Sequence, residues 1–267
     1  MTQTNLDNYL DIRQEDIPRE IILNSKLKKW QMKVEMLNCN GAYLSTVKKV
    51  ICIHPANHSV ALFLKMKDKA DICLYCHPLL AKEESKQFVI SYTQKYNYPL
   101  VILTRMETIE VLMRNNGVPH KHRRWCSRVF KIEPTILFYK TYIPSGVIEY
   151  FGIQKFQSKE RSKMTPELKK DPKSQKRYKI YSELPIFYES EEFSTKMMQK
   201  AQIHAFKDSV RGYNRYGCFL CPFAGKKYYE ELKENDIKTY NECCRLMSIA
   251  SEKQPERYYY YRKSKVM

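Results

Sequence analysis

The chain has 267 residues, an apolar content of 43% and a formal net charge of +18 at pH 7. Its length suits one large α/β domain, or a core domain with a smaller one, and its apolar content excludes an intrinsically disordered chain. The polar, acidic N-terminal stretch is unlike a signal peptide, and no apolar run approaches the roughly 20 residues of a membrane helix. We therefore expect a cytoplasmic protein without a membrane segment.

The first predicted element is an N-terminal helix within residues 12–40, because apolar side chains recur there at near-helical spacing. Four apolar runs then predict strands, and helical patterns at residues 59–67 and 80–95 separate the first three of them. The runs cover residues 50–53, 70–75, 100–103 and 147–153. Strands that are apolar on both faces and alternate with helices predict an α/β fold with a parallel sheet.

The second half of the chain is predicted to contain a basic linker followed by a mainly helical region. Residues 155–179 hold ten Lys or Arg against three acids and predict a basic linker. Residues 180–267 are expected to be mainly helical. We therefore predict an N-terminal helical segment over residues 1–45, an α/β core over 46–165, and a basic linker with a helical, cysteine-containing region over 166–267.

The basic charge predicts nucleic acid as a partner, because a large positive charge favours polyanions. A lysine-rich surface that only aids solubility is the alternative. The segment RYYYYRKSK at residues 257–265 could stack and pair with a single strand, or could be a helix end that packs on the core.

Ligands of parallel sheets bind beyond the carboxyl ends of the strands. The first of these ends reads His54-Pro55-Ala56-Asn57-His58-Ser59. A strand, a tight loop and a helix in this order typically cradle phosphate, but this loop contains neither glycine nor lysine. Other strand ends place Cys76-His77, Thr104-Arg105 and Gln154-Lys155 at the same edge.

Cys126 lies in the strongly basic segment HKHRRWCSRVFKIEP, residues 120–134. If a helix begins nearby, its dipole and the surrounding cations would lower the pKa of this thiol and favour the thiolate. A metal, a cluster or a covalent sulfur carrier needs that thiolate. The alternative is a structural cysteine in a basic helix.

A second cysteine group, Cys218-x-x-Cys221, is bracketed by Gly217 and Pro222 and has the spacing of metal ligands. Two further ligands are needed, for which Cys126 and either Cys244 or Cys243 are the candidates. Zinc and an iron–sulfur cluster both accept four cysteines. The pair Cys73 and Cys76 is different: on a strand they point to opposite faces, so Cys73 belongs to the core and Cys76 could face the cleft.

Taken together, the chain resembles the phosphoadenosine phosphosulfate (PAPS) reductase family, within the PP-loop ATP pyrophosphatases, from about residue 47 to 245. The segment 48–65 occupies the place of the PP-loop SGGKDS and its flanking strand and helix. The family's RWC segment is matched at 124–126, with KIEP at 131–134. Its G-C-x-x-C-P segment is matched at 217–222. The resemblance implies an adenine-nucleotide α-hydrolase-like (HUP) sandwich.

The resemblance also implies site residues. Cysteines in these places hold a [4Fe-4S] cluster in some relatives, which makes Cys126, Cys218, Cys221 and Cys244 (or Cys243) the expected ligands, with zinc as the alternative. Cys126 and Ser59 are the implied catalytic residues, and an adenine nucleotide is the implied ligand. Its expected contacts are His54, Asn57, His58, Ser59, Arg124, Lys131, Ser158 and Arg161.

The departures from the family pattern are concentrated in the nucleotide motifs. Pro55 removes a backbone N–H from the loop, and Asn57 replaces its lysine. Gln154 and Gln157 stand where the family has arginine and glutamate, and no cysteine follows Cys244 as a reductase tail would require. We therefore expect a degenerate member with a cysteine-ligated centre that binds nucleic acid or nucleotide.

Two alternatives remain. One is an active sulfur transferase or sulfonucleotide enzyme with an altered loop, in which protonated His54 and His58 would contact phosphate. The other is an interaction protein whose zinc ion only stabilises the C-terminal region.

Overall fold

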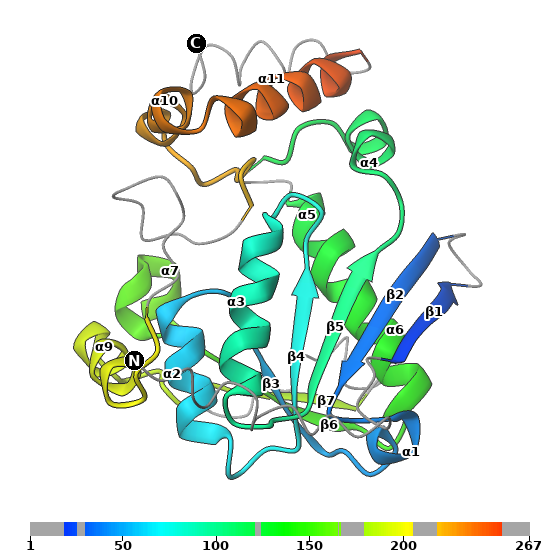
Figure 1. The fold of residues 1–267 in the computed structure, drawn as a ribbon, viewed down its shortest axis with the longest axis vertical. Coiled ribbons are helices and arrows are strands. Elements are labelled where there is room, and N and C mark those ends of the chain that lie inside the picture. Colours follow the sequence, from blue (N-terminus) through cyan, green and yellow to red (C-terminus); the bar gives the residue numbers. More distant parts are fainter. Residues whose placement is uncertain are drawn as a thin grey trace, which may run out of the picture.

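The computed structural model describes residues 19–25, 30–120, 124–164, 166, 179–204 and 218–252. Their centre is a seven-stranded sheet in the order β1-β2-β5-β4-β3-β6-β7 (Figure 1). The strands are β1 (Arg19–Ser25), β2 (Trp30–Leu37), β3 (Lys49–Cys52), β4 (Ile72–His77), β5 (Leu100–Arg105), β6 (Val147–Phe151) and β7 (Ile180–Glu183). Strands β3 to β7 pair in parallel, which confirms the α/β fold class.

The prediction of an N-terminal helix was wrong. Strands β1 and β2 form an antiparallel hairpin, and β2 pairs antiparallel with β5. The residues of β2 alternate strictly between buried and less buried positions, with Trp30, Met32, Val34 and Met36 facing the core. This period of two outweighs the near-helical spacing, because the two methionines complete an alternating apolar face.

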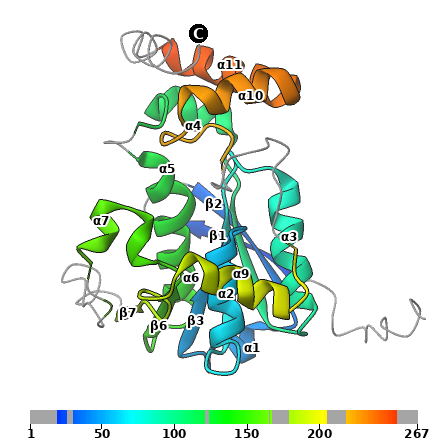
Figure 2. The same ribbon diagram turned by 90° about the vertical axis from the view of Figure 1, so that its left-hand side faces the viewer.

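Helices cover both faces of the sheet, as Figure 2 shows with the sheet seen edge-on. On one face, α2 (Asn57–Met66), α3 (Glu83–Gln94) and α9 (Glu191–Lys200) pack on the strands. On the other face lies a helical run formed by α5 (Trp125–Ser127), η3 (Arg128–Ile132) and α6 (Glu133–Tyr142). The remaining short helices are α1 (Gly41–Leu44), η4 (Lys155–Gln157) and α7 (Lys159–Ser162).

A third cluster of buried residues lies beyond the carboxyl ends of β4 and β5 (Figure 1). It joins α4 (Ile109–Asn116) and the start of the α5 run to α10 (Lys226–Asn235) and α11 (Ile237–Ser251). Trp125 belongs to this cluster, and its buried indole Nε1–H donates a hydrogen bond of 3.0 Å to the carbonyl oxygen of Gly117. The segments around residues 117 and 125 are thereby fixed next to each other.

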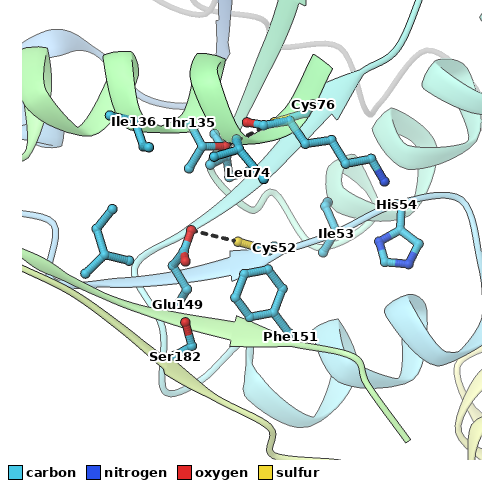
Figure 3. Close-up of a pocket in the computed structure, with 13 residues that line it drawn as sticks. Cys52, Ile53, His54, Leu74, Cys76, Thr135, Ile136, Glu149, Phe151 and Ser182 are labelled. Carbon is cyan, nitrogen blue, oxygen red and sulfur yellow. Dashed lines mark hydrogen bonds between the residues drawn. The ribbon is translucent and has the colours of Figure 1, made fainter. Parts of the chain in front are cut away.

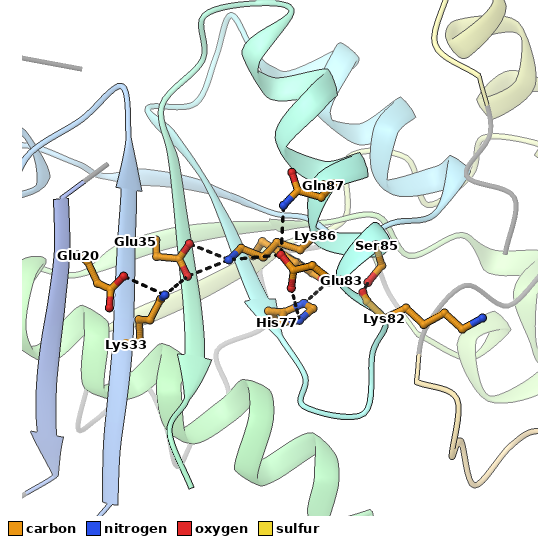
Figure 4. Close-up of polar contacts among 10 residues, drawn as sticks. Glu20, Lys33, Glu35, His77, Lys82, Glu83, Ser85, Lys86 and Gln87 are labelled. Atoms are coloured by element: carbon orange, nitrogen blue, oxygen red, sulfur yellow. Dashed lines mark hydrogen bonds and ion pairs between the residues drawn. The ribbon is translucent and has the colours of Figure 1, made fainter. Parts of the chain in front are cut away.

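Charged side chains tie the N-terminal hairpin to the parallel part of the sheet (Figure 4). Lys33 on β2 pairs with Glu20 and Glu35, and Glu35 pairs in turn with Lys86 of α3 at 2.8 Å. Lys86 and Glu35 are mostly shielded from solvent, so this contact is screened less than an exposed ion pair. The hairpin is therefore an integral part of the sheet.

None of the described helices combines the length and the apolar character that crossing a membrane requires. Several sequence expectations concern other parts of the chain. The segment at 257–265, residues 211–217, Lys121, Arg123 and most of the basic stretch, residues 167–178, lie outside the described residues.

Candidate nucleotide and metal site

A pocket of about 370 Å³ opens at the carboxyl edge of the sheet, between the strands and α6 (Figure 3). Cys52 and Cys76 line it from β3 and β4, Glu149 and Phe151 line it from β6, and Ile136 faces them from α6. This is the place where parallel α/β sheets bind ligands. Its volume lies near the lower end of the range for small-molecule sites, about 300–1,000 Å³.

The loop after β3 leads from this pocket into α2. Ser59 is fully buried, and its Oγ accepts a hydrogen bond of 2.8 Å from the backbone N–H of His54. The hydroxyl thus holds the two ends of the loop together. His54 itself lines the pocket.

His54 and His58 face each other, with their Nε2 atoms 3.1 Å apart. Burial lowers the pKa of His58 to about 4, helped by the positive charge of Arg161. Burial, His58 and the charges of Lys131 and Arg161 lower the pKa of His54 well below its ordinary value. Both rings are therefore neutral at pH 7, which argues against the expected contact between an imidazolium and phosphate.

The amino end of α2 keeps a feature of a phosphate site. Its N-cap, Ala56, makes no side-chain hydrogen bond, and the first N–H groups of a helix have no partner within the helix. The side-chain Oδ1 of Asn57, the first residue of α2, is buried without a hydrogen-bond partner among the described residues. At this end the N–H of Ser59 already donates to the carbonyl oxygen of Ala56 at 2.9 Å, which leaves the N–H groups of Asn57 and His58 as the helix donors available to an anion.

Two of the three predicted cations, Lys131 and Arg161, lie near these elements, whereas Arg124 does not line the pocket. Lys131 lines the pocket, and Arg161 acts electrostatically on both histidines. Arg124 is exposed and lies over the ring of Phe223, with 5.6 Å from its guanidinium carbon to the ring centroid. Arg124 therefore contacts the segment that follows the Cys218–Cys221 turn.

The segment that was expected to form a second nucleotide motif, residues 154–161, makes structural contacts. Gln154 is buried, and its Nε2 donates to the carbonyl oxygens of Glu189 and Ser190 and to the Oγ of Ser194. Ser158 caps α7, accepting a hydrogen bond of 3.1 Å from the N–H of Arg161. The glutamine thus connects the end of β6 to α9.

The cysteines expected to bind metal come together in the C-terminal cluster. Cys126, Cys218, Cys221 and Cys244 all pack on the same set of buried residues. Cys218 also forms a β-bridge with Ala81, which places the C-x-x-C turn on the loop that follows β4. Burial raises the pKa of Cys218 to about 12, and its thiol interacts electrostatically with those of Cys221 and Cys126.

The environment of Cys126 differs from the expectation. The residue lies in the first turn of the α5 run, as predicted. The pKa of its thiol was expected to be lowered, but burial raises it. The backbone N–H of Ser127 and the charge of Lys131 oppose this effect without cancelling it. The prediction counted cations and overlooked the desolvation of the sulfur.

The two adjacent cysteines of α11 have different surroundings. The Sγ of Cys243 is buried and donates a weak hydrogen bond of 3.5 Å to the carbonyl oxygen of Phe219. Cys244 is partly buried and lies beside Tyr240. Within the described part of the chain, no three Cys, His, Asp or Glu side chains already have the arrangement of a metal site.

The donor set nevertheless fits a cysteine-ligated group. The thiols of Cys126, Cys218 and Cys221 interact electrostatically with one another, and a fourth thiol lies on α11. Zinc and iron–sulfur clusters both use cysteine thiolates as ligands. The site residues remain predictions.

Other residues at the strand ends are engaged elsewhere. His77 points away from the pocket, with its Nδ1 3.1 Å from the hydroxyl of Tyr75 and its Nε2 3.7 Å from Glu83. Arg105 is buried, pairs with Glu107 and Glu133, and lies over the ring of Trp30. Cys73 is fully buried and Cys76 lines the pocket, as period-two alternation predicted.

Sequence reasoning missed the acidic residue of the pocket. Glu149 is the only acid among the described residues that line the pocket, and its Oε1 accepts hydrogen bonds from Tyr139 (2.9 Å) and Cys52 (3.5 Å). Burial raises its pKa to about 7, although these two donors oppose the shift. A lone acid inside the apolar strand VIEYF was the available signal.

The family model for the phosphoadenosine phosphosulfate reductase domain matches residues 56–224. This range covers more than half of the chain, so the protein belongs to the PAPS reductase domain family. The matched range begins within the loop that precedes α2 and includes Ser59, Cys126 and the Cys218–Cys221 turn.

Two curated relatives come from Methanocaldococcus jannaschii. "Uncharacterized protein MJ0066" is 26% identical over 164 residues, which are 61% of this chain and 33% of the relative. "Uncharacterized protein MJ0973" is 27% identical over 157 residues, 57% of this chain and 35% of the relative. The aligned region thus spans about a third of the length of either relative.

Among solved structures, the chain is similar to phosphoadenylyl-sulfate (PAPS) reductase from Candida auris in its phosphate complex. The TM-score is 0.44 at 13% sequence identity, and the match covers 61% of this chain and 77% of that chain.

Proposed function

We propose that this PAPS reductase-family chain binds a nucleotide in the pocket and carries a cysteine-ligated iron–sulfur cluster or zinc ion beside it. The observation that carries this proposal is the position of Lys131. Lys131 lines the pocket, and its charge acts on His54 and also on Cys126 and Cys218. The pocket and the cysteine group are therefore close enough to work as one site.

In the proposed complex, the phosphates lie toward the amino end of α2. The helix N–H groups and the dipole favour an anion there, and Lys131 and Arg161 add positive charge. Pro55 and the neutral histidine pair provide weaker phosphate contacts than a glycine- and lysine-containing loop. We therefore expect binding without rapid ATP hydrolysis.

In the proposed centre, Cys126, Cys218 and Cys221 are three ligands, and Cys244 is the preferred fourth. Cys244 is less buried than Cys243, whose sulfur already donates to the carbonyl oxygen of Phe219. When bound, a cluster could bind sulfide, whereas zinc would mainly hold the four segments together. The raised thiol pKa values mean that a metal must displace protons, so its affinity rises with pH.

Nucleic acid is the proposed macromolecular partner, supported by the net charge of +18. A second candidate function, sulfur transfer to a nucleotide or nucleic acid, is favoured by Lys131, which lines the pocket and acts electrostatically on Cys126. Pyrophosphate release from ATP that requires both sulfide and a nucleic acid would support sulfur transfer. Absence of any nucleotide binding would rule it out.

Calorimetric titration of the anaerobically purified full chain with ATP tests the nucleotide site. We expect saturable binding that weakens about five- to tenfold in Lys131→Gln, because a cation near phosphate is lost. The matched control is Lys238→Gln, which removes the same charge from an exposed position of α11, outside the pocket. This control should bind ATP as the unmodified chain does, and an equal loss of affinity in both variants would count against a phosphate contact of Lys131.

A further inference from the structure

We propose that the Glu149 end of the pocket is a base subsite that selects a nucleobase carrying an exocyclic amino group. This inference rests on the proposed nucleotide site and adds what that site would recognise. Its basis is one buried carboxyl group with an oxygen left over for a ligand.

Glu149 is 7% exposed and lines the pocket from the middle of β6. Both hydrogen bonds that it accepts, from Tyr139 and Cys52, end on Oε1. Oε2 is thus left without a hydrogen-bond partner among the described residues. Oε2 is not among the fully buried atoms that lack a partner in the described residues, so it is reachable from the pocket, where an N–H donor of a ligand can pair with it.

The walls around Glu149 suit a flat heterocycle. Figure 3 shows Phe151 on the same side of the pocket as Glu149, with Leu74 and Ile136 on the opposite side. Apolar walls with one well-placed polar group are typical of small-molecule sites, in which the polar group fixes orientation. Offset stacking on the Phe151 ring would add to burial of the base.

The charged residues of the pocket indicate which end of a bound nucleotide lies inside it. Glu149 pairs in register with Val50, two residues before β3 ends at Cys52, so it lies about 7 Å inside the edge of the sheet. Lys131 and His54 interact with each other near the loop that follows β3. A nucleotide therefore fits with its base inward at Glu149 and its phosphates outward at the loop.

A purely structural carboxyl group, held by Tyr139 and Cys52, is the competing explanation. It predicts no dependence of binding on the base. Matched nucleotide pairs separate the two explanations, because each pair keeps the sugar and the phosphates and changes only the group that faces Glu149.

The experiment is calorimetric titration of the full chain at pH 8, where the carboxylate form dominates. The probes are adenosine triphosphate against purine-riboside triphosphate, which lacks the amino group, and cytidine against uridine triphosphate. We expect the amino-bearing member of each pair to bind at least about tenfold more tightly, as for a hydrogen bond to a charged group.

The variant Glu149→Gln tests the same subsite by replacing the acceptor oxygen that faces the ligand with a donor. Tyr139 and Cys52 can still donate to the amide oxygen, which leaves the amide NH₂ facing the ligand. The preference for cytidine over uridine triphosphate should then vanish or reverse. Glu192→Gln, the same substitution on the exposed side of α9, should leave every ratio unchanged.

Equal affinities within each pair in the unmodified chain would overturn the base subsite while leaving the nucleotide site standing. An unchanged ratio in a folded Glu149→Gln variant would also overturn it. If that variant does not fold, the pairs measured on the unmodified chain decide. Failure of all four triphosphates to bind would overturn the proposed function, and the base subsite with it.

Discussion

The Nε2 atoms of His54 and His58 lie 3.1 Å apart, so one imidazole donates a hydrogen bond to the other at the start of α2. A protonated pair would place two N–H donors against each other, and burial already disfavours the charge. The loop that follows β3 is therefore held by a contact between two neutral rings.

This contact predicts that both rings stay neutral at physiological pH. Ring-nitrogen NMR shifts followed from pH 8 to 4 should show His58 protonating only near pH 4. Because its folded-state pKa is lowered, the stability linked to this ring is present above its ordinary value of 6.5 and is lost as the pH falls toward 4. Protonation of either ring near pH 6.5 would contradict the account.

Gly152 predicts a second test of the same loop. A Cβ at this position would lie 3.0 Å from the carbonyl oxygen of His58 and 3.3 Å from its Cδ2. Gly152→Ala should therefore displace His58, lower the free energy of unfolding by about 1–2 kcal/mol and weaken ATP binding. Gly41→Ala is the matched control, because its Cβ would meet only Tyr142 at 3.8 Å. Equal unfolding midpoints for the two variants would count against the close packing of Gly152 on His58.

Glu149 predicts an unusual pH dependence of stability. Its pKa rises from 4.5 to about 7 on folding, so the fold favours the protonated form. The associated stability is present below pH 4.5 and is lost as the pH rises through 7, by on the order of 3 kcal/mol. The groups that interact with it, Tyr139 and Cys52 through hydrogen bonds and Cys76 electrostatically, have pKa values raised by burial and stay neutral in this range.

Urea unfolding of the unmodified chain and of Glu149→Gln at pH 5 and pH 8 measures this effect. The difference in unfolding free energy between the two proteins should shift in favour of the variant as the pH rises. A difference that does not change with pH would show that the carboxyl group is not desolvated as the structure indicates.

The strands at the centre of the sheet were predictable because they are short apolar runs that are buried on both faces. The hairpin was missed because Met32 and Met36, which complete the alternating face of β2, were not counted with the β-branched and aromatic residues. Strand β7 was missed because IYSE offers only four residues beside a strongly basic stretch. Strand β7 forms through its parallel pairing with β6, because its own four residues carry only a weak strand pattern.

The site was predictable in part for similar reasons. Motif spacing located the loop at 54–59 and the cysteine segments, and strand alternation placed Cys76 in the pocket. The pKa of Cys126 was not predictable, because desolvation depends on residues far apart in the sequence. Glu149 was missed because its partner Tyr139 is ten residues away on α6, and no short motif connects them.

Binding to nucleic acid should be electrostatic if the basic charge has this function. The full chain should bind single-stranded DNA or RNA with an affinity that falls linearly on a log–log plot against salt concentration. Substituting the five basic residues of the 167–178 stretch by glutamine should make that slope shallower. They are Lys169, Lys170, Lys173, Lys176 and Arg177. No affinity at low salt, or a slope that these substitutions leave unchanged, would contradict the prediction.

The central claim is a cysteine-ligated centre beside the pocket, and metal analysis of the anaerobically purified full chain tests it most directly. We predict about four iron and four acid-labile sulfide per chain, or about one zinc, with a large loss in Cys126→Ser, Cys218→Ser and Cys221→Ser. Cys39→Ser, at a cysteine outside the C-terminal cluster, should keep the metal. A chain without stoichiometric iron or zinc, or an equal metal content in all four variants, would contradict the claim.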